Sequence, residues 1–159
     1  LKLKQDFFIY GTPKSSIELR QLVDDNILGP DKNSRFALEE VITKFYLKGV
    51  VGNDKKVGDN SIDGVFGYSI EDKNYRGLVQ VTSGSNKNHL KAFCSEVAKV
   101  EGQIGVYITF ADCVTDGFIH EVKSYGKVYN VDRIQILTIE DLVDKGIQPK
   151  MPTNQRTLF

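Results

Sequence analysis

The chain has 159 residues with 21 basic and 21 acidic side chains, so its formal net charge is zero. Hydrophobic residues make up 40% and aromatic residues 10%, which is enough to bury one sheet in a single α/β domain. A neutral chain lacks the overall positive charge of a general nucleic-acid binder, so a nucleic-acid partner would have to meet a local basic patch. No apolar run approaches the length of a transmembrane helix, about 18 residues, and the N-terminus lacks the apolar stretch of a signal peptide.

Cysteine usage indicates a reducing environment. Cys94 and Cys113 sit in apolar segments without the spacing of a metal-binding motif. This placement favours buried, reduced thiols, and therefore a cytoplasmic protein over a secreted one held together by disulfides. The chain begins at Leu1 and its only methionine is Met151, from which we expect it to be a piece of a longer protein.

The first third of the chain predicts two helices separated by a loop. Ser15 and Glu18 have the spacing of a capping box, in which Ser15 caps the first turn and Glu18 falls at the third helical position. Apolar residues then recur at helical spacing until the pattern breaks at 24–33. A second helix is expected at about 34–48, with one apolar stripe and Gly49 as the residue that ends it.

Residues from 49 onward have a pattern typical of strands. Segments 64–70 and 76–82 are rich in Val, Tyr, Phe and Leu, and the polar residues 71–74 between them predict a hairpin loop. The apolar run at 104–110 (IGVYITF) predicts a strand buried on both faces, central in the sheet and parallel to strand 76–82. The remaining expected elements are a helix marked by apolar residues from 90 to 100, a helix at 114–125, a strand at 133–139 and a short helix at 140–145.

The order of these elements predicts the fold class. A helix, a β-hairpin, a helix, a strand, a helix, a strand and a last helix are typical of an α/β domain with a mixed central sheet and helices on both faces. We expect residues 1–48 to form a helical N-terminal segment packed on a core at 49–152, followed by a tail at 153–159. The segment after Gly146, which contains two prolines, is expected to be irregular.

One group of polar residues indicates chemistry at the edge of this sheet. Alternate residues of a strand share a face, so Val79 and Val81 would point into the core, while Gln80 and Thr82 point to the other side. Asp63 would lie beside them, and we expect the three polar residues to form one cluster open to solvent. A carboxylate with neighbouring oxygens can hold Mg²⁺, which polarises a phosphodiester and lowers the pKa of a bound water. The same arrangement also fits an ordinary hairpin.

The order and spacing of short motifs resemble the Mrr-like restriction endonuclease domains of the PD-(D/E)XK type. Those domains carry D-G-G-I-D-G, a hairpin, Q-V-K, a helix and a strand like G-V-F-I-T, and this chain has D-N-S-I-D-G at 59–64, Q-V-T at 80–82 and G-V-Y-I-T at 105–109. The chain is still more similar to the nuclease-like domain at the C-terminus of some site-specific DNA methyltransferases, where a strand like R-I-Q-I-L-T-I-E-D-L (133–142) precedes a short tail with lysine and proline. The resemblance covers 49–152 well and the first third loosely.

This resemblance implies a restriction-endonuclease-like mixed central sheet and assigns roles to four residues. Asp63 matches the family's metal-binding aspartate, and Gln80 matches the glutamine that stands where most of the superfamily has an acidic residue. The two together would bind Mg²⁺, and Glu39 matches a glutamate that these domains often place near the metal. Thr82 occupies the position of the motif lysine, and threonine supplies no cation to steady the attacking water or the developing negative charge.

The missing lysine predicts weak or absent catalysis, because losing one electrostatic stabiliser typically slows a reaction about 10²–10³-fold. Lys87 and Lys91, around the start of the following helix, are candidates for a lysine that has migrated, although both also fit ordinary solvated positions. Together with Lys55 and Lys56 in the loop before residue 59, they are candidate contacts to a DNA backbone.

Other polar and aromatic residues fit simple structural roles. His89, at the expected start of a helix, is interpreted as a surface or capping residue, although it has the reach to contact a phosphate. His120 lies on a predicted helix without a nearby metal-ligating partner. Tyr68 and Tyr75 are expected to pack rather than to serve as platforms for base stacking.

The resemblance leaves two classes of function open. The first is a Mg²⁺-dependent DNA endonuclease of a restriction–modification system, weakened or inactivated because Thr82 replaces the motif lysine. The alternative is a binding module of the same fold, with decayed chemistry, that holds DNA or a partner protein. The implied partners are DNA and either a DNA methyltransferase domain or a second copy of the chain, and no membrane is expected. A structural interaction domain without DNA contact also fits the zero net charge.

Overall fold

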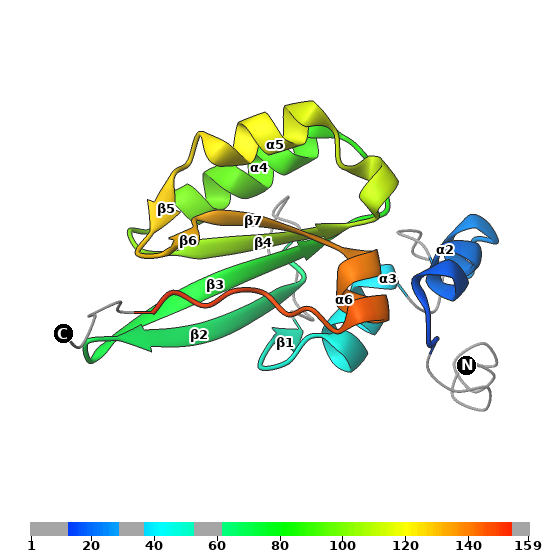
Figure 1. Ribbon diagram of the computed structural model, residues 1–159, viewed down its shortest axis with the longest axis horizontal. Coiled ribbons are helices and arrows are strands. Elements are labelled where there is room, and N and C mark those ends of the chain that lie inside the picture. Colours follow the sequence, from blue (N-terminus) through cyan, green and yellow to red (C-terminus); the bar gives the residue numbers. More distant parts are fainter. Residues whose placement is uncertain (1–12, 29–36, 53–61, 154–159) are drawn as a thin grey trace.

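The computed structural model describes residues 13–28, 37–52 and 62–153 (Figure 1). A five-stranded mixed sheet forms its centre, and the strands, in spatial order, are β1 (Val51–Gly52), β2 (Gly64–Ile70), β3 (Lys73–Val81), β4 (Ile104–Thr109) and β7 (Ile134–Thr138). Strands β1, β2 and β3 pair antiparallel, and β4 and β7 run parallel to β3. The predicted α/β class is confirmed, as are the interior position of β4 and its parallel pairing with β3.

Helices cover both faces of this sheet. They span α2 (Ser16–Asp24), α3 (Leu38–Val41) with its π-helical continuation η1 (Ile42–Tyr46), α4 (Lys87–Ala98), the short 3₁₀ turn η2 (Ala111–Cys113), α5 (Asp116–Lys123) and α6 (Ile139–Lys145). Helices α4 and α5 pack on one face, while α2, α3, η1 and α6 contribute to the core on the other. Within the ranges that the structure describes, no helix is long and apolar enough to cross a membrane.

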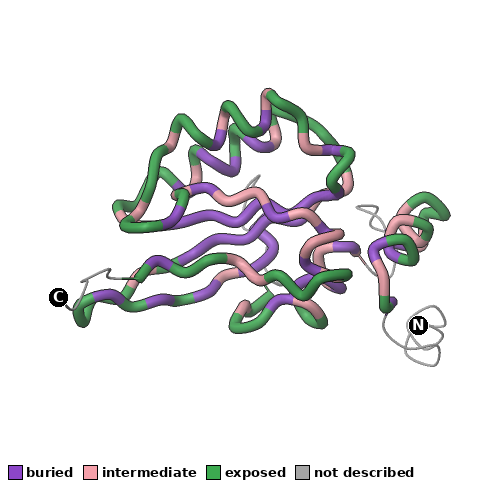
Figure 2. Tube along the Cα trace, in the orientation of Figure 1, coloured by how far each residue is buried: buried purple, intermediate pink, exposed green. Residues whose placement is uncertain are grey.

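Alternation along β3 sends successive side chains into two different cores. Val79 and Val81 join the core shared with α2, α3 and α6, whereas Leu78 joins the core under α4 and α5. All six residues of β4 are buried, as expected for a strand covered on both faces, and Figure 2 shows the inner strands buried beneath exposed helix surfaces. The predicted inward direction of Val79 and Val81 is confirmed.

The β2–β3 hairpin is tighter than the sequence indicates. Ile70 pairs directly with Lys73, so the connection is a two-residue turn at Glu71 and Asp72, and the expected four-residue loop is wrong. Both turn residues have positive φ, 50° and 66°, the conformation of the two-residue turns whose twist matches that of paired strands. Residues 73 and 74 belong to β3; they are polar because this end of the hairpin is exposed.

The predicted cap at the start of the first helix is confirmed, whereas the predicted end of the second helix at Gly49 is wrong. The Ser15 hydroxyl accepts a hydrogen bond from the Glu18 N–H at 3.1 Å, while the Glu18 carboxylate accepts from the N–H of Lys14 at 2.9 Å. The second helix ends earlier than expected, with Leu47 as an extended C-cap. Gly49 lies two residues further on with φ +71°, a conformation that glycine adopts without a steric penalty. Of the second helix expected at 34–48, residues 38–46 are helical, and residues 34–36 lie outside the described residues.

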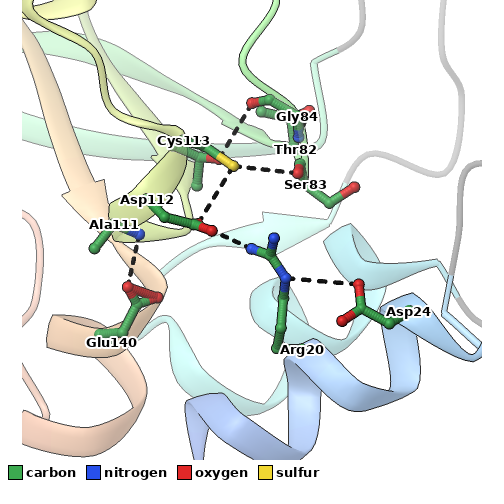
Figure 3. A network of polar contacts seen from close by, with 10 residues as sticks. Arg20, Asp24, Thr82, Ser83, Gly84, Ala111, Asp112, Cys113 and Glu140 are labelled. Carbon is green, nitrogen blue, oxygen red and sulfur yellow. Dashed lines mark hydrogen bonds and ion pairs between the residues drawn. The ribbon is translucent and has the colours of Figure 1, made fainter.

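Polar contacts dock α2 onto the core at two points. Ser16 donates from its N–H and its hydroxyl to the two carboxylate oxygens of Asp144 on α6, at 2.8 and 2.5 Å. Arg20 donates to Asp112 at 3.0 Å, and its guanidinium lies 4.6 Å from the centre of the Phe110 ring. Figure 3 shows Arg20 between Asp112 and Asp24.

Three strands and the state of the cysteines complete the fold. The sequence pattern did not predict the short edge strand β1, nor a two-stranded ribbon formed by β5 (Lys127–Val128) and β6 (Val131–Asp132). Cys94 and Cys113 are both buried and free, so the predicted buried thiols are confirmed. Burial, with the Glu121 carboxylate adding a smaller effect, raises the pKa of Cys94 to about 12.

Candidate functional site

The β2–β3 hairpin fixes the position of Asp63. Because Gly64 pairs with Val79, Asp63 lies one residue beyond β2, and its N–H donates to the carbonyl of Val79 at 2.8 Å. Its carboxylate Oδ2 then accepts the N–H of Val81 at 2.8 Å. The Asp63 side chain therefore continues the hydrogen bonding between the two strands past the start of β2. Its partner, Val81, is the residue between Gln80 and Thr82 in the sequence.

Gln80 lies on the face of the sheet that α4 covers. Its amide Nε2 is 2.8 Å from Nε2 of His89, and the hydroxyl of Tyr107, its register partner on β4, is 3.5 Å from Nδ1 of His89. The amide nitrogen of Gln80 can only donate, so in this orientation the Nε2 of His89 is the acceptor. Gln80, His89 and Tyr107 thus form one polar chain beneath α4.

The candidate site is more buried than expected. Only 5% of Asp63 and 2% of Gln80 is exposed, so the prediction that both are open to solvent is wrong. Alternation had placed Gln80 on the face away from Val79 and Val81, but α4 covers that face as well, with His89 over Gln80. Buried polar side chains of this kind are hydrogen-bonded in native proteins.

His89 is the residue whose role the sequence analysis underestimated. The Oδ1 of the α4 cap residue, Asn86, accepts from the N–H groups of Asn88 and His89 at 3.0 and 3.3 Å, which fixes the first turn of the helix. That turn places the His89 ring over Gln80. The sequence could have indicated the start of this helix, since Asn86 is a strong N-cap residue and His89 is at the third position after it. The direction of the His89 ring follows only from the packing of α4 on β3.

Tyr107 is a second residue of this site whose role the sequence motifs did not indicate. Its side chain is fully buried, and burial, with smaller effects from Cys94 and Cys113, raises the pKa of its hydroxyl to about 12. The phenol therefore stays protonated at neutral pH and acts as a neutral hydrogen-bonding group. The rings of Phe93 and Phe118 lie 5.7 and 6.0 Å from it, centre to centre.

Thr82 is held in the loop after β3. Its N–H donates to the carbonyl of Ile108 at 2.9 Å, and its hydroxyl accepts the N–H of Gly84 at 3.2 Å. The same loop is tied to the sheet end by Cys113, whose thiol donates to the Ser83 carbonyl at 3.4 Å (Figure 3). Position 82 therefore presents a short hydroxyl in a fixed turn and supplies no positive charge.

Two of the four candidate lysines, Lys87 and Lys91, belong to the described residues. Lys87 is exposed in the first turn of α4, and its Nζ reaches the start of α5, where a Cβ added to Gly117 would lie 3.6 Å from it. Lys91 is exposed one turn later. Neither side chain forms an ion pair with any part of the chain that the structure describes. Lys55 and Lys56 lie outside the described residues.

Glu39 lies on α3, which packs against β3. The residue is half-buried, and its backbone carbonyl accepts the hydroxyl of Thr43 at 2.8 Å. Over 13–28, 37–52 and 62–153, no group of three or more His, Cys, Asp or Glu side chains is arranged to hold a metal ion. Asp63 and Gln80 together offer one carboxylate and one amide oxygen, hard donors of the type that Mg²⁺ accepts while keeping several waters.

A search of protein-family models, of curated proteins and of solved structures with this chain found no match in any of the three. The resemblance to Mrr-like domains therefore remains a prediction that rests on the motifs at 59–64, 80–82 and 105–109.

Proposed function

We propose that this chain is a nuclease-fold domain of the Mrr-like type that associates with DNA and cleaves it weakly with Mg²⁺. The observation that carries the proposal is the fixed carboxylate of Asp63 at the end of the β2–β3 hairpin, next in register to Gln80 and Thr82. The motif order that suggested this type of domain places the same three residues at one end of a hairpin. A restriction–modification system in the cytoplasm, with a DNA methyltransferase domain or a second copy of the chain as partner, is the setting proposed for it.

Asp63 and Gln80 would hold the Mg²⁺ ion, which when bound supplies a polarised phosphate and a water of lowered pKa. The Val81 N–H fixes the Asp63 carboxylate. His89 contacts the nitrogen of the Gln80 amide. The amide oxygen of Gln80 is then the atom that would serve as a ligand to the metal. Glu39, on the helix packed against β3, is the proposed additional carboxylate near the ion.

Weak cleavage follows from the residue at position 82. A lysine there would place a positive charge near the attacking water and the developing negative charge on the phosphate, and threonine does not. Lys87 extends towards α5, so it does not serve as an obvious substitute. The residues proposed to contact a DNA backbone are Lys55, Lys56, Lys87 and Lys91, and contacts of this kind supply affinity that falls as salt increases.

Cleavage of supercoiled plasmid with Mg²⁺ or Mn²⁺, on methylated and unmethylated DNA, tests this proposal. We expect slow nicking that disappears with EDTA and in Asp63→Asn. Nicking that is equal in the two proteins would remove Asp63 from the chemistry and with it the nuclease assignment.

A catalytically decayed module that holds DNA or a partner protein is the second candidate, and the burial of Gln80 favours it. That candidate predicts salt-dependent DNA binding without any metal-dependent nicking.

A further inference from the structure

A cavity of about 520 Å³ lies at the end of the sheet opposite to Asp63. Asp63 precedes β2 and faces the last residue of β3, whereas the cavity lies at the start of β3, just before β4, and beside the β5–β6 ribbon. Figure 1 shows this ribbon close to the turn between α4 and β4. The residues that line it include Lys73, Tyr75, Glu101, Tyr125, Lys127 and Tyr129.

Tyr75 forms a fixed aromatic wall. Its ring stacks on Tyr68, with 5.2 Å between ring centres and 17° between planes. The hydroxyl of Tyr68 donates to the carbonyl of Gly102, and Gly102 has φ +76°. A Cβ on Gly102 would lie 2.5 Å from Cε1 of Tyr75, so the glycine is what allows the Tyr75 ring to lie across this turn.

Tyr129 occupies an unfavourable backbone conformation next to that wall. It follows Val128, which pairs with Val131, so Tyr129 stands in a two-residue turn with φ +53°. A bulky side chain is strained there, and glycine or asparagine is the usual residue. Tyr129 is 51% exposed, and the neighbouring Tyr75 hydroxyl raises the pKa of Tyr129. Backbone strain kept at an exposed aromatic residue points to a role other than stability.

The cavity also carries uncompensated positive charge. The ammonium groups of Lys73 and Lys127 make no hydrogen bond or ion pair with the described part of the chain. Arg133 is a third cation in the lining, and it donates to the carbonyls of Gln103 and Val100 at 3.1 and 2.8 Å. Glu101 is the one carboxylate in the lining, so three cations less one anion leave a charge of plus two.

We propose that this cavity binds a nucleotide, an aromatic base that carries a phosphate. The base would stack among Tyr75, Tyr125 and Tyr129, and the phosphate would meet Lys73 and Lys127, because aromatic faces and cations together select such ligands. Glu101 would accept from an amino or hydroxyl group of the ligand. The cavity volume lies within the range of small-ligand sites, about 300–1,000 Å³. The ligand's source is either a free mononucleotide or an unpaired, 5′-phosphorylated nucleotide of a DNA strand.

Isothermal titration calorimetry of the full chain in EDTA tests the proposal with defined probes. These are deoxyadenosine 5′-monophosphate, deoxyadenosine, inorganic phosphate, a 5′-phosphorylated single strand and a blunt duplex. We expect the monophosphate to bind more tightly than deoxyadenosine or phosphate. Tighter binding of the phosphorylated strand than of the monophosphate would assign the site to DNA ends, and the reverse would assign it to free nucleotides. No binding of either one, or phosphate that binds as tightly as the monophosphate, would overturn the proposal.

Two variants separate a built site from general attraction to positive charge. Lys127→Ala should weaken binding about tenfold through loss of one charge-assisted contact. Lys48→Ala removes an exposed lysine that does not line the cavity and should leave binding unchanged. Tyr129→Gly should weaken binding while the melting temperature stays the same or rises, because the substitution relieves the strained turn. Equal affinity of wild type, Lys127→Ala and Tyr129→Gly would overturn the assignment. Asp63→Asn should bind as wild type does, which separates this site from the proposed nuclease site.

Discussion

The amide nitrogen of Gln80 lies 2.8 Å from Nε2 of His89, and this contact joins the end of β3 to the first turn of α4. Gln80 is almost wholly buried, and a buried amide without a partner is costly. His89 therefore orients the Gln80 side chain, because its contact with the amide nitrogen sets which atom of Gln80 faces away from α4. This role holds for any chemistry at the candidate site.

Replacing His89 with alanine should lower the free energy of unfolding by about 1–3 kcal/mol, because the substitution removes the partner of the buried Gln80 nitrogen. His120→Ala is the matched control, since His120 is exposed on α5, and such substitutions usually change stability by less than about 0.5 kcal/mol. Urea denaturation of both variants measures the difference. Equal midpoints would show that the contact between Gln80 and His89 does not contribute to stability.

Asp63 should tolerate asparagine better than alanine. Asparagine keeps an oxygen that accepts the N–H of Val81, whereas alanine leaves this buried donor unpaired, at a cost of about 1–3 kcal/mol. Both variants remove the negative charge, so both should abolish metal-dependent nicking. Thermal unfolding and the plasmid assay, run on the same preparations, separate the two effects. Similar melting temperatures for Asp63→Asn and Asp63→Ala would mean that the hydrogen bond to Val81 is not significant.

Thr82→Lys should raise metal-dependent nicking, by as much as about 10²-fold if the missing cation is what limits the rate. The ammonium group would extend from the turn next to Asp63 and Val81 towards the water that attacks the phosphate. Ser85→Lys adds the same charge in the exposed part of the same loop and should have no such effect. An equal gain in both variants would indicate improved DNA binding alone. No gain in Thr82→Lys would favour the module with decayed chemistry.

Val106→Asp should unfold the domain. Val106 is fully buried in the interior strand β4, and a charge without a partner there costs more than about 4 kcal/mol. Val51→Asp places the same side chain on the edge strand β1, where Val51 is 74% exposed, and should change stability little. Circular dichroism during heating compares them. A folded Val106→Asp variant with the wild-type melting temperature would contradict the observed burial.

The attachment of α2 should depend on pH through Asp144. Hydrogen bonds from the hydroxyl and the N–H of Ser16 hold the pKa of Asp144 below its ordinary value. A carboxyl whose pKa is lower in the folded state stabilises the fold above its unfolded pKa, about 3.9, and this contribution is lost as the pH falls through the folded value.

Wild type should therefore exceed Asp144→Ala in stability by up to about 1 kcal/mol at neutral pH, after allowance for solvent screening. The gap should close as the pH falls below about 4. Chemical denaturation at a series of pH values measures it, with Asp132→Ala as a control for loss of an exposed carboxylate. A gap that stays constant from pH 7 to pH 3 would show that Asp144 acts without its charge.

Local patterns in the sequence were sufficient for most of the architecture. The cap at Ser15 and the buried strand β4 follow from residues close together in the chain. The length of β2 and the parallel pairing of β3 with β4 were also predicted, because apolar periodicity and helical connections between strands restrict the topology strongly. The hairpin turn at Glu71 and Asp72 was not, since polar strand residues at an exposed tip resemble a loop.

The environment of Gln80 was decided by the tertiary structure alone. Alternation along β3 places Gln80 on the face away from Val79 and Val81 whether that face is wet or covered, so the sequence cannot tell an open site from a buried one. The packing of α4 decided it, by bringing His89 over Gln80. The cavity around Tyr75 and Tyr129 has the same origin, because it joins residues from β3, from the turn before β4 and from the β5–β6 ribbon, which are distant in the sequence and adjacent only after folding.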